Sequence, residues 1–391
     1  MKNKILITFF LVLLYLPRVF SQPSNDTLVY LVTCGPGTDT YSIYGHGALR
    51  IAIPAQNIDN VYNWGVFDFS TPNFAWKFAK GRLDYMLDTE SFRGFIRGYF
   101  LEKRYVISQR INLDSNETKR LIDLINENLK PENINYRYDF FYDDCTTRIR
   151  DLLEKSVGDK LLYPPVETVK NPSFRYLVGK YQKSLPWLNF GIDLIMGFPA
   201  DKKAPFRDRM FLPIEMKNEL SEAVINRSGK MIPLLQNPVT ILDFNPPVVK
   251  ENFLISPVFV FTLLLIIIII LSSLMKTRKS NKLIDIIIYA IFSILALLLI
   301  FFNFFTDHQQ MKWNLNIIWL NPFILLCLHS VIMNRAGTIW FRIVFILSTI
   351  FLVVLIVLPQ AFNIAFFPLM IMLLFRSSVR AGFEWNPLTL K

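Results

Sequence analysis

A cysteine at the predicted start of a helix is the residue best suited to covalent chemistry in this sequence. Cys145 follows Asp144, which is a favourable N-cap residue. Apolar residues then recur at helical spacing from Ile149 to Val157, until Gly158 ends the pattern. Cys145 would therefore lie in the first turn, where unpaired backbone N–H groups and the helix dipole favour a thiolate. We expect Cys145 to be a nucleophile.

Histidine is the base that such a nucleophile needs, and His46 is the only histidine before residue 300. The two carboxylates that precede the cysteine disfavour a thiolate, so a cationic partner is required. His46 lies between two glycines at the start of a strand-like run, and the glycines let other groups approach the imidazole. We therefore predict a Cys145–His46 pair.

A third polar group is expected to orient the imidazole. Asn63, on the next predicted strand, is the first candidate, and Asp68 is the alternative. Two non-catalytic interpretations stay open. In one, Cys145 is a buried structural thiol or forms a disulfide with Cys34, and in the other His46 is only a packed strand residue. We expect both thiols to be free.

Strand and helix patterns alternate around these residues and are joined by long loops. Strands are expected over residues 27–34, 46–53, 61–69 and 104–112. A surface helix is expected over 115–130, capped by Asp114 or Ser115. This mixture indicates an α+β domain.

The start of the chain and its charge indicate an exported protein. Residues 1–21 combine a basic start, an apolar run and small or compact residues that end at Ser21. This pattern is typical of a cleaved secretory signal. The formal net charge of +11 does not indicate nucleic-acid binding. Lys and Arg are scattered in the first half and lie at the ends of apolar runs in the second half. Residues 22–185 are thus the predicted exported domain.

Residues 186–250 are rich in proline, and we expect irregular structure with short helices there. The segment 186–198 within this region is strongly apolar and is followed by basic residues. It is either a core segment of the exported domain or an interfacial element that dips toward lipid. Both interpretations stay open.

Residues 251–391 form a predicted membrane domain of about five helices. Apolar runs over 253–275 and 283–305 are long enough to span a bilayer, and weaker candidates cover 317–333, 338–358 and 362–375. The basic clusters after the first, third and fifth runs fall in the cytoplasm if the first domain is exported. The sequence therefore predicts a multi-pass protein of the inner membrane.

The outer loop between the second and third runs is unusually polar. It carries His308, Asn314 and Asn316, and Asn321 follows inside the third run. Polar groups at this depth cost free energy unless they have partners or a function. They are expected either to cap helices and bond between them, or to help receive a substrate.

Three short motifs carry a family resemblance. They are SIYGH ending at His46, YNWG beginning at Tyr62, and FYDDCTTR around Cys145. With these motifs and its membrane half, the chain resembles the Lnb-type lipoprotein N-acyltransferases. Their exported domain resembles the circularly permuted branch of the NlpC, papain-like group, and the order of His before Cys fits that branch. The resemblance implies an α+β, circularly permuted papain-like domain followed by an all-α transmembrane domain.

The resemblance also implies a ping-pong acyl transfer. His46 would deprotonate Cys145, and the thiolate would take an acyl chain from a phospholipid. The chain would then pass to the α-amino group of the diacylglyceryl-cysteine of a bacterial lipoprotein. Phospholipid and diacylated lipoprotein are the expected partners, and no cofactor or metal is expected. Substrate contacts are expected from Tyr44, Asp144, Arg148, His308, Asn314 and Asn316.

Two other functions stay open. The chain can be a membrane-tethered cysteine peptidase or amidase that acts on cell-wall peptides, since the papain-like group includes many. It can also be a non-enzymatic scaffold whose exported domain binds an envelope partner. Lipid dependence separates the first from the acyltransferase, and loss of activity in Cys145→Ser separates both enzymes from the scaffold.

The predicted topology places Lys279 in the cytoplasm and His308 outside it, because the basic clusters otherwise lie on the wrong side. Lys279→Cys and His308→Cys variants can be labelled with a thiol reagent that does not cross the inner membrane. We expect label on His308→Cys once the outer membrane is permeable, and on Lys279→Cys only after the inner membrane is breached. The reverse pattern would refute the five-span arrangement.

Overall fold

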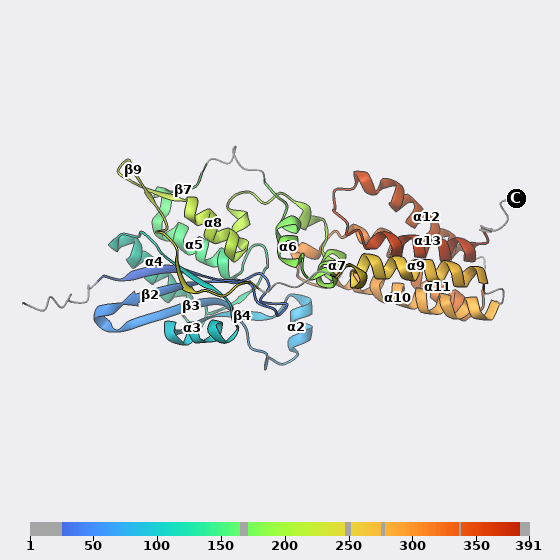
Figure 1. Cartoon of the computed structure of the whole chain (residues 1–391), viewed down its shortest axis with the longest axis horizontal. Helices are drawn as coiled ribbons and strands as arrows, with labels where there is room; N and C mark the ends of the chain where they lie inside the picture. Colours follow the sequence, from blue (N-terminus) through green and yellow to red (C-terminus); the bar gives the residue numbers. More distant parts are fainter. Residues whose placement is uncertain (1–25, 165–170, 247–251, 275–277, 336–337, 384–391) are drawn as a thin grey trace, which may run out of the picture.

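The computed structural model describes residues 26–164, 171–246, 252–274, 278–335 and 338–383. The predicted signal segment 1–21 lies outside the described residues. The described chain has two parts, a sheet-based domain and a bundle of apolar helices that extends from it (Figure 1). This confirms the predicted α+β domain followed by a helical domain.

A seven-stranded antiparallel sheet is the centre of the first part. Its strand order is β10-β5-β1-β2-β3-β4-β6. The strands are β1 Leu28–Cys34, β2 His46–Ile53, β3 Ile58–Val66, β4 Asp84–Ser91, β5 Val106–Arg110, β6 Asn135–Arg137 and β10 Val239–Leu242. The strands expected at 27–34, 46–53, 61–69 and 104–112 are therefore present as β1, β2, β3 and β5.

Helices cover both faces of this sheet (Figure 1). On one face, Leu49 and Trp64 of the strands pack against Leu153 and its neighbours in a large apolar core. On the other face, Ala48 packs with Phe95 in a smaller cluster. The helices are α2 Phe74–Lys80, α3 Phe92–Leu101, α4 Ser115–Asn128, α5 Cys145–Val157 and α8 Pro213–Glu222.

The domain extends beyond the predicted boundary at residue 185. Strand β10 pairs with β5 in the main sheet, and Met216 and Leu220 of α8 lie in the same core as Leu49. A small second sheet has the order β7-β8-β9. Its strands are β7 Leu161–Leu162, β8 Val224–Arg227 and β9 Lys230–Pro233. The proline-rich segment therefore returns to the exported domain instead of forming a separate unit.

The apolar segment 186–198 forms α7, Pro186–Ile195, which packs against the membrane helices. The ring centroid of Phe190 lies 5.0 Å from that of Phe261 and 5.4 Å from that of Phe366. Leu194 belongs to the apolar core of the membrane half. Met196, at the end of the segment, belongs to an apolar cluster of the exported domain. The segment thus joins the two parts, and its predicted approach to lipid stays a prediction.

Five helices follow in the second part. They are α9 Pro257–Leu274, α10 Arg278–Phe304, α11 Phe323–Ile332, α12 Ile339–Val354 and α13 Phe366–Ala381. Among the described residues, three helices are long and apolar enough to cross a membrane, and a fourth span results if the bent pair 309–318 and 323–332 counts as one. Helix α13 has 16 residues, fewer than the about 20 of a typical span. The total of five membrane spans therefore stays a prediction.

A polar junction joins the two parts. Arg175 donates to the carboxylates of Asp193 and Asp201 at 2.9–3.1 Å. The same carboxylates accept from the loop between α12 and α13, through the Ala361 backbone N–H at 3.1 Å and Asn363 Nδ2 at 2.9 Å. Since Arg175 and Asp201 are nearly buried, these bonds are protected from water and hold the exported domain against the bundle.

One buried carboxylate ties three membrane helices together. Asp285 of α10 accepts from Arg376 of α13 at 2.6 Å and pairs with Arg380. Arg376 also donates to Ser272 of α9 at 2.6 Å. Both Asp285 and Arg376 are buried. A buried charge that loses its partner is costly, so this cluster is a stability determinant.

We expect Asp285→Leu to destabilise the protein by about 3–5 kcal/mol, because two guanidinium groups lose their buried counter-charge. Unfolding of the detergent-solubilised protein measures the change. The matched control is Asp285→Leu combined with Arg376→Met, which removes the more deeply buried charge together with its partner and should recover most of the loss. An equal free energy of unfolding for Asp285→Leu and the unaltered protein would contradict this account.

Candidate active site

The N-terminus of α5 has the predicted cap. The Oδ1 atom of Asp144 accepts from the backbone N–H groups of Thr146 at 3.0 Å and Thr147 at 2.8 Å. Thr147 Oγ1 in turn accepts from the Asp144 backbone N–H at 2.7 Å, which completes a capping box. Gly158 ends the helix, as expected. Cys145 is therefore the first residue of α5.

Two glycines let this helix end approach the sheet closely. A Cβ atom at Gly65 would lie 3.5 Å from Cys145 Cβ, and one at Gly47 would lie 3.0 Å from Thr146 Cγ2. Gly65 also has φ +87°, which favours glycine. The thiol of Cys145 lies beside the backbone N–H of Gly47. The first turn of α5 thus packs on β2 immediately after His46.

A hydrogen-bonded row runs from the imidazole across two further strands. His46 Nε2 lies 3.3 Å from Asn63 Oδ1, and Asn63 Nδ2 donates to Glu90 Oε1 at 3.1 Å. Asn63, not Asp68, is therefore beside the imidazole. The Asp68 carboxylate instead accepts from Ser70 at 2.6 and 2.8 Å. Glu90 was not expected, because the strand that carries it gave no recognisable pattern in the sequence.

Cys145 and His46 lie in adjoining elements but are not hydrogen-bonded to each other. The thiol contacts the Gly47 N–H, and Nδ1 of His46 has no hydrogen-bond partner among the residues the structure describes. Nε2 is taken by Asn63, so Nδ1 is the nitrogen free to accept a proton. Direct transfer from the thiol therefore requires that one of the two side chains move, as catalytic groups often do when substrate binds.

Burial sets the protonation of both groups. It raises the pKa of Cys145 well above its usual range, and the Asp144 carboxylate adds to this. The backbone N–H groups of Gly47, Thr146 and Cys145 act in the opposite direction but do not outweigh it. Burial also lowers the pKa of His46 to about 4. The expected thiolate at the helix start is therefore wrong for the resting site, which holds a neutral thiol and a neutral imidazole.

Burial also raises the pKa of Asp144 to about 7, against the hydrogen bonds from Thr147 and Thr146. A carboxyl group with this pKa is partly protonated near neutral pH. When Asp144 is charged, its negative charge helps to raise the pKa of Cys145. The capping residue therefore also affects the ionisation of the thiol.

Tyr44 and Arg148, two of the predicted substrate-binding residues, are engaged within the domain. Tyr44 Oη accepts from Gln182 Nε2 at 2.7 Å. Arg148 donates to both carboxylate oxygens of Asp143 at 2.6 and 2.9 Å, and its guanidinium lies 3.5 Å from the centre of the Tyr136 ring. These contacts support the loops around Cys145. No substrate contact is needed to explain them.

The predicted residues of the outer loop do not gather around Cys145. Asn314 and Asn316 are buried, and their Nδ2 atoms donate to the Leu194 carbonyl at 2.8 and 3.2 Å. Their contacts match the structural alternative, bonding between elements. His308 lies against Gly81, with Nε2 3.1 Å from the Phe78 carbonyl oxygen. Among the described residues, no group of His, Cys, Asp or Glu is arranged to hold a metal ion.

Two family models match the chain. Residues 17–173 match the Lnb N-terminal periplasmic domain, and residues 249–384 match the Lnb transmembrane domain. No curated protein and no solved structure is significantly similar to the chain. The first match contains Cys145, His46 and Asn63, and the second contains the five helices α9–α13.

We expect Cys145 to react slowly with iodoacetamide in the folded protein at pH 7, with a rate that still rises above pH 9. The reason is that a raised pKa leaves little thiolate at neutral pH. Isotope-coded alkylation with mass spectrometry of the Cys145 peptide from pH 6 to 10 measures this rate.

Two comparisons sharpen this test. Asp144→Asn removes a negative charge that raises the thiol pKa, so the variant should react faster above about pH 7, where Asp144 is charged, and at nearly the same rate at pH 6. Cys34, whose pKa burial raises to about 12, should stay unreactive and serves as an internal reference. A rate for Cys145 that reaches its plateau below pH 7 would show a stabilised thiolate and contradict the expectation.

Proposed function

The chain belongs to the Lnb family, and from this premise we propose that it is a lipoprotein N-acyltransferase. Its two family domains make it a lipoprotein-modifying membrane protein with a periplasmic domain. In the proposed reaction an acyl chain moves from a phospholipid to the α-amino group of the diacylglyceryl-cysteine of a lipoprotein. The proposed setting is the inner membrane, with the catalytic domain on its periplasmic side.

The placement of the Cys145 thiol carries this proposal. The thiol lies at the first turn of α5, close to the backbone N–H groups of Gly47 and Cys145, whereas the N–H of Thr146 donates to the Asp144 cap. Such N–H groups can hold the negative oxygen that forms when a nucleophile attacks an ester carbonyl. His46 lies directly before Gly47 in β2, with Asn63 on its Nε2. A thiol, a base with an orienting amide and a set of oxyanion donors thus adjoin one another.

In the first half-reaction, Cys145 attacks the ester carbonyl of the phospholipid while His46 Nδ1 takes the thiol proton. The tetrahedral intermediate collapses by releasing the lysophospholipid oxygen, which recovers the proton from the imidazolium. The products are an S-acyl enzyme and a lysophospholipid. Asn63, held by Glu90, keeps the imidazole in one orientation and accepts from its Nε2–H as positive charge develops.

In the second half-reaction, the α-amino group of the lipoprotein attacks the thioester. The neutral imidazole accepts a proton from the amine and returns it to the departing sulfur, so the thiol is restored and an amide is formed. His46 is suited to this step, since its pKa of about 4 keeps it neutral near pH 7. Burial of Cys145 limits access of water, which would otherwise hydrolyse the thioester.

The proposal predicts a covalent intermediate. Protein given labelled phospholipid without lipoprotein should accumulate an acyl group on Cys145 that hydroxylamine releases, because the acceptor amine is missing. Mass spectrometry of the Cys145 peptide locates the label. Addition of a diacylated lipopeptide should transfer the label to its amino terminus.

Variants distinguish this mechanism from its alternatives. Cys145→Ala should carry no label, and His46→Ala should form it at least about 100-fold more slowly, since the general base is lost. Asp68→Asn is the matched control, because the Asp68 carboxylate accepts from Ser70 and, among the described residues, from no other group, and this variant should label normally. A peptidase or a scaffold would form no lipid-derived adduct. Label that persists in Cys145→Ala would assign the chemistry to another residue.

A further inference from the structure

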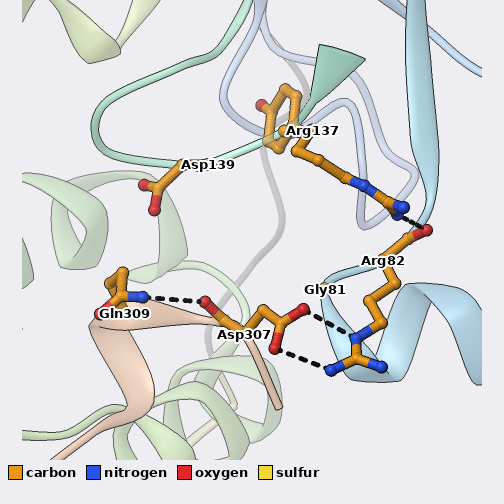
Figure 2. Close-up of a pocket in the computed structure, with 7 residues that line it drawn as sticks. Gly81, Arg82, Arg137, Asp139, Asp307 and Gln309 are labelled. Carbon is orange, nitrogen blue, oxygen red and sulfur yellow. Dashed lines mark hydrogen bonds and ion pairs between the residues drawn. The ribbon is translucent and has the colours of Figure 1, made fainter. Parts of the chain in front are cut away.

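A cavity of about 370 Å³ lies where the exported domain meets the outer loop of the membrane half. Its walls carry Arg82, Arg137, Tyr138 and Asp139 from the domain, and Asp307 and Gln309 from the loop that follows α10 (Figure 2). The volume falls in the range of small-ligand sites, about 300–1,000 Å³. None of the steps proposed above uses these charged groups.

The cavity lies at the depth expected for lipid headgroups. The apolar helix α10 ends at Phe304, and Asp307 follows three residues later. On the domain side, α2 exposes Trp76 and Phe78, and the Trp76 ring lies 5.5 Å from that of Phe301 in α10. Exposed aromatic residues at the end of a membrane helix are typical of the interface between acyl chains and headgroups. A lipid in the outer leaflet can therefore present its headgroup here.

Two guanidinium groups form one side of the cavity. Arg82 pairs with Asp307 at 2.8 Å, and both side chains are about half exposed. Arg137 donates to the Arg82 carbonyl and lies 3.4 Å from Asp84 in an exposed pair. Exposed ion pairs contribute little stability, so a phosphate can replace the carboxylates at small cost. Planar guanidinium groups suit phosphate oxygens.

A carboxylate without a salt bridge stands on the opposite side, and His308 is a basic side chain that interacts with it electrostatically. Figure 2 shows Asp139 across the cavity from Arg137 and Arg82. Its Oδ1 accepts from the backbone N–H groups of Phe141 and Tyr142 at 2.9 and 3.1 Å. Among the described residues it has no salt bridge, and no donor reaches its Oδ2. A cation is therefore the complementary group for this side of the cavity.

The cavity adjoins the candidate active site through one ring. Tyr138 lines the cavity, and its Cε2 lies 3.8 Å from the position of a Cβ at Gly65. That same position is 3.5 Å from Cys145 Cβ. In a glycerophospholipid, only a few bonds separate the phosphate from the two acyl esters. A headgroup held in the cavity therefore brings its esters toward the thiol.

We propose that this cavity binds the headgroup of the acyl-donor phospholipid and selects one that joins a phosphate to an amine, as in phosphatidylethanolamine. Arg137 and Arg82 bind the phosphate, and Asp139 binds the ammonium group. Gly81 also lines the site, and a Cβ atom at this position would lie 3.2 Å from the His308 ring. The inference rests on the proposed function for the role of the lipid as donor, but lipid binding can be tested without turnover.

The first test measures lipid retention by native mass spectrometry. The full-length Cys145→Ala protein, which cannot turn over, is given an equimolar mixture of phosphatidylethanolamine and phosphatidylglycerol. We expect retention of phosphatidylethanolamine to exceed that of phosphatidylglycerol by about five- to tenfold, the effect of one charge-assisted hydrogen bond. Arg137→Gln in this background should reduce retention of both lipids. Asp139→Asn in the same background should bring the ratio of retained phosphatidylethanolamine to retained phosphatidylglycerol near one.

Matched charge changes outside the cavity control for non-specific effects. Arg97→Gln on α3 and Asp123→Asn on α4 alter exposed residues that do not line the cavity, and both should retain the lipids as the Cys145→Ala protein does. A competition needs no cavity variant. Soluble glycerophosphoethanolamine should displace the lipid headgroup, whereas inorganic phosphate at the same concentration should not.

Defined results would overturn the inference. Retention that is equal in Arg137→Gln, Asp139→Asn and the two controls would exclude the cavity as the headgroup site. Unchanged retention in Asp139→Asn would assign Asp139 to the acceptor amine instead if the same change, made in the protein that keeps Cys145, slowed transfer from S-acyl enzyme to lipopeptide. Failure of the proposed function would give a different pattern. The unaltered protein would then acquire no acyl label on Cys145 from any lipid, but the cavity would still retain one headgroup in preference to the other.

Discussion

The close approach of α5 to the sheet is the constraint on which the candidate site depends. A side chain larger than hydrogen at position 47 would press on Thr146, and position 65, whose Cα faces Cys145, has a backbone conformation that favours glycine. If the helix end were displaced, the Gly47 N–H would leave the thiol, and the oxyanion donors would no longer converge. The capping box of Asp144 then fixes the direction of those donors.

In the proposed acyl transfer, burial of the thiol would let one site prefer an amine over water. A site dry enough to protect a thioester also removes the solvation of a thiolate, so the resting pair of Cys145 and His46 is neutral. In the proposed reaction, charge would develop only when an ester oxygen is present to receive it beside the backbone N–H groups. A low thiolate content is thus a consequence of the same enclosure that suppresses hydrolysis.

Local patterns in the sequence predicted the parts of the fold that local physics determines. Capping and periodicity located α4 and α5, and alternation located β1, β2, β3 and β5. Strand β4 and helices α2 and α3 were not predicted, and Glu90 was missed with them. The prediction of a thiolate at Cys145 was wrong because a helix terminus is a local feature that the sequence reveals, whereas burial of the thiol depends on the whole domain. The predicted domain boundary at residue 185 did not allow for β10, which pairs with β5 in the main sheet of the exported domain.

The polar residues of the junction show why the two halves act as one unit. Asn314 and Asn316 were candidates for substrate binding, yet they hold the end of α7 through the Leu194 carbonyl. Arg175 orders the carboxylates that accept from the loop before α13. Because the bonds from Asn314 and Asn316 are buried, the end of α7 is held firmly against the outer loop of the membrane half. In the proposed acyl transfer, the thiol must meet an ester close to the membrane surface, and a firm junction between the two parts would keep the ester within its reach.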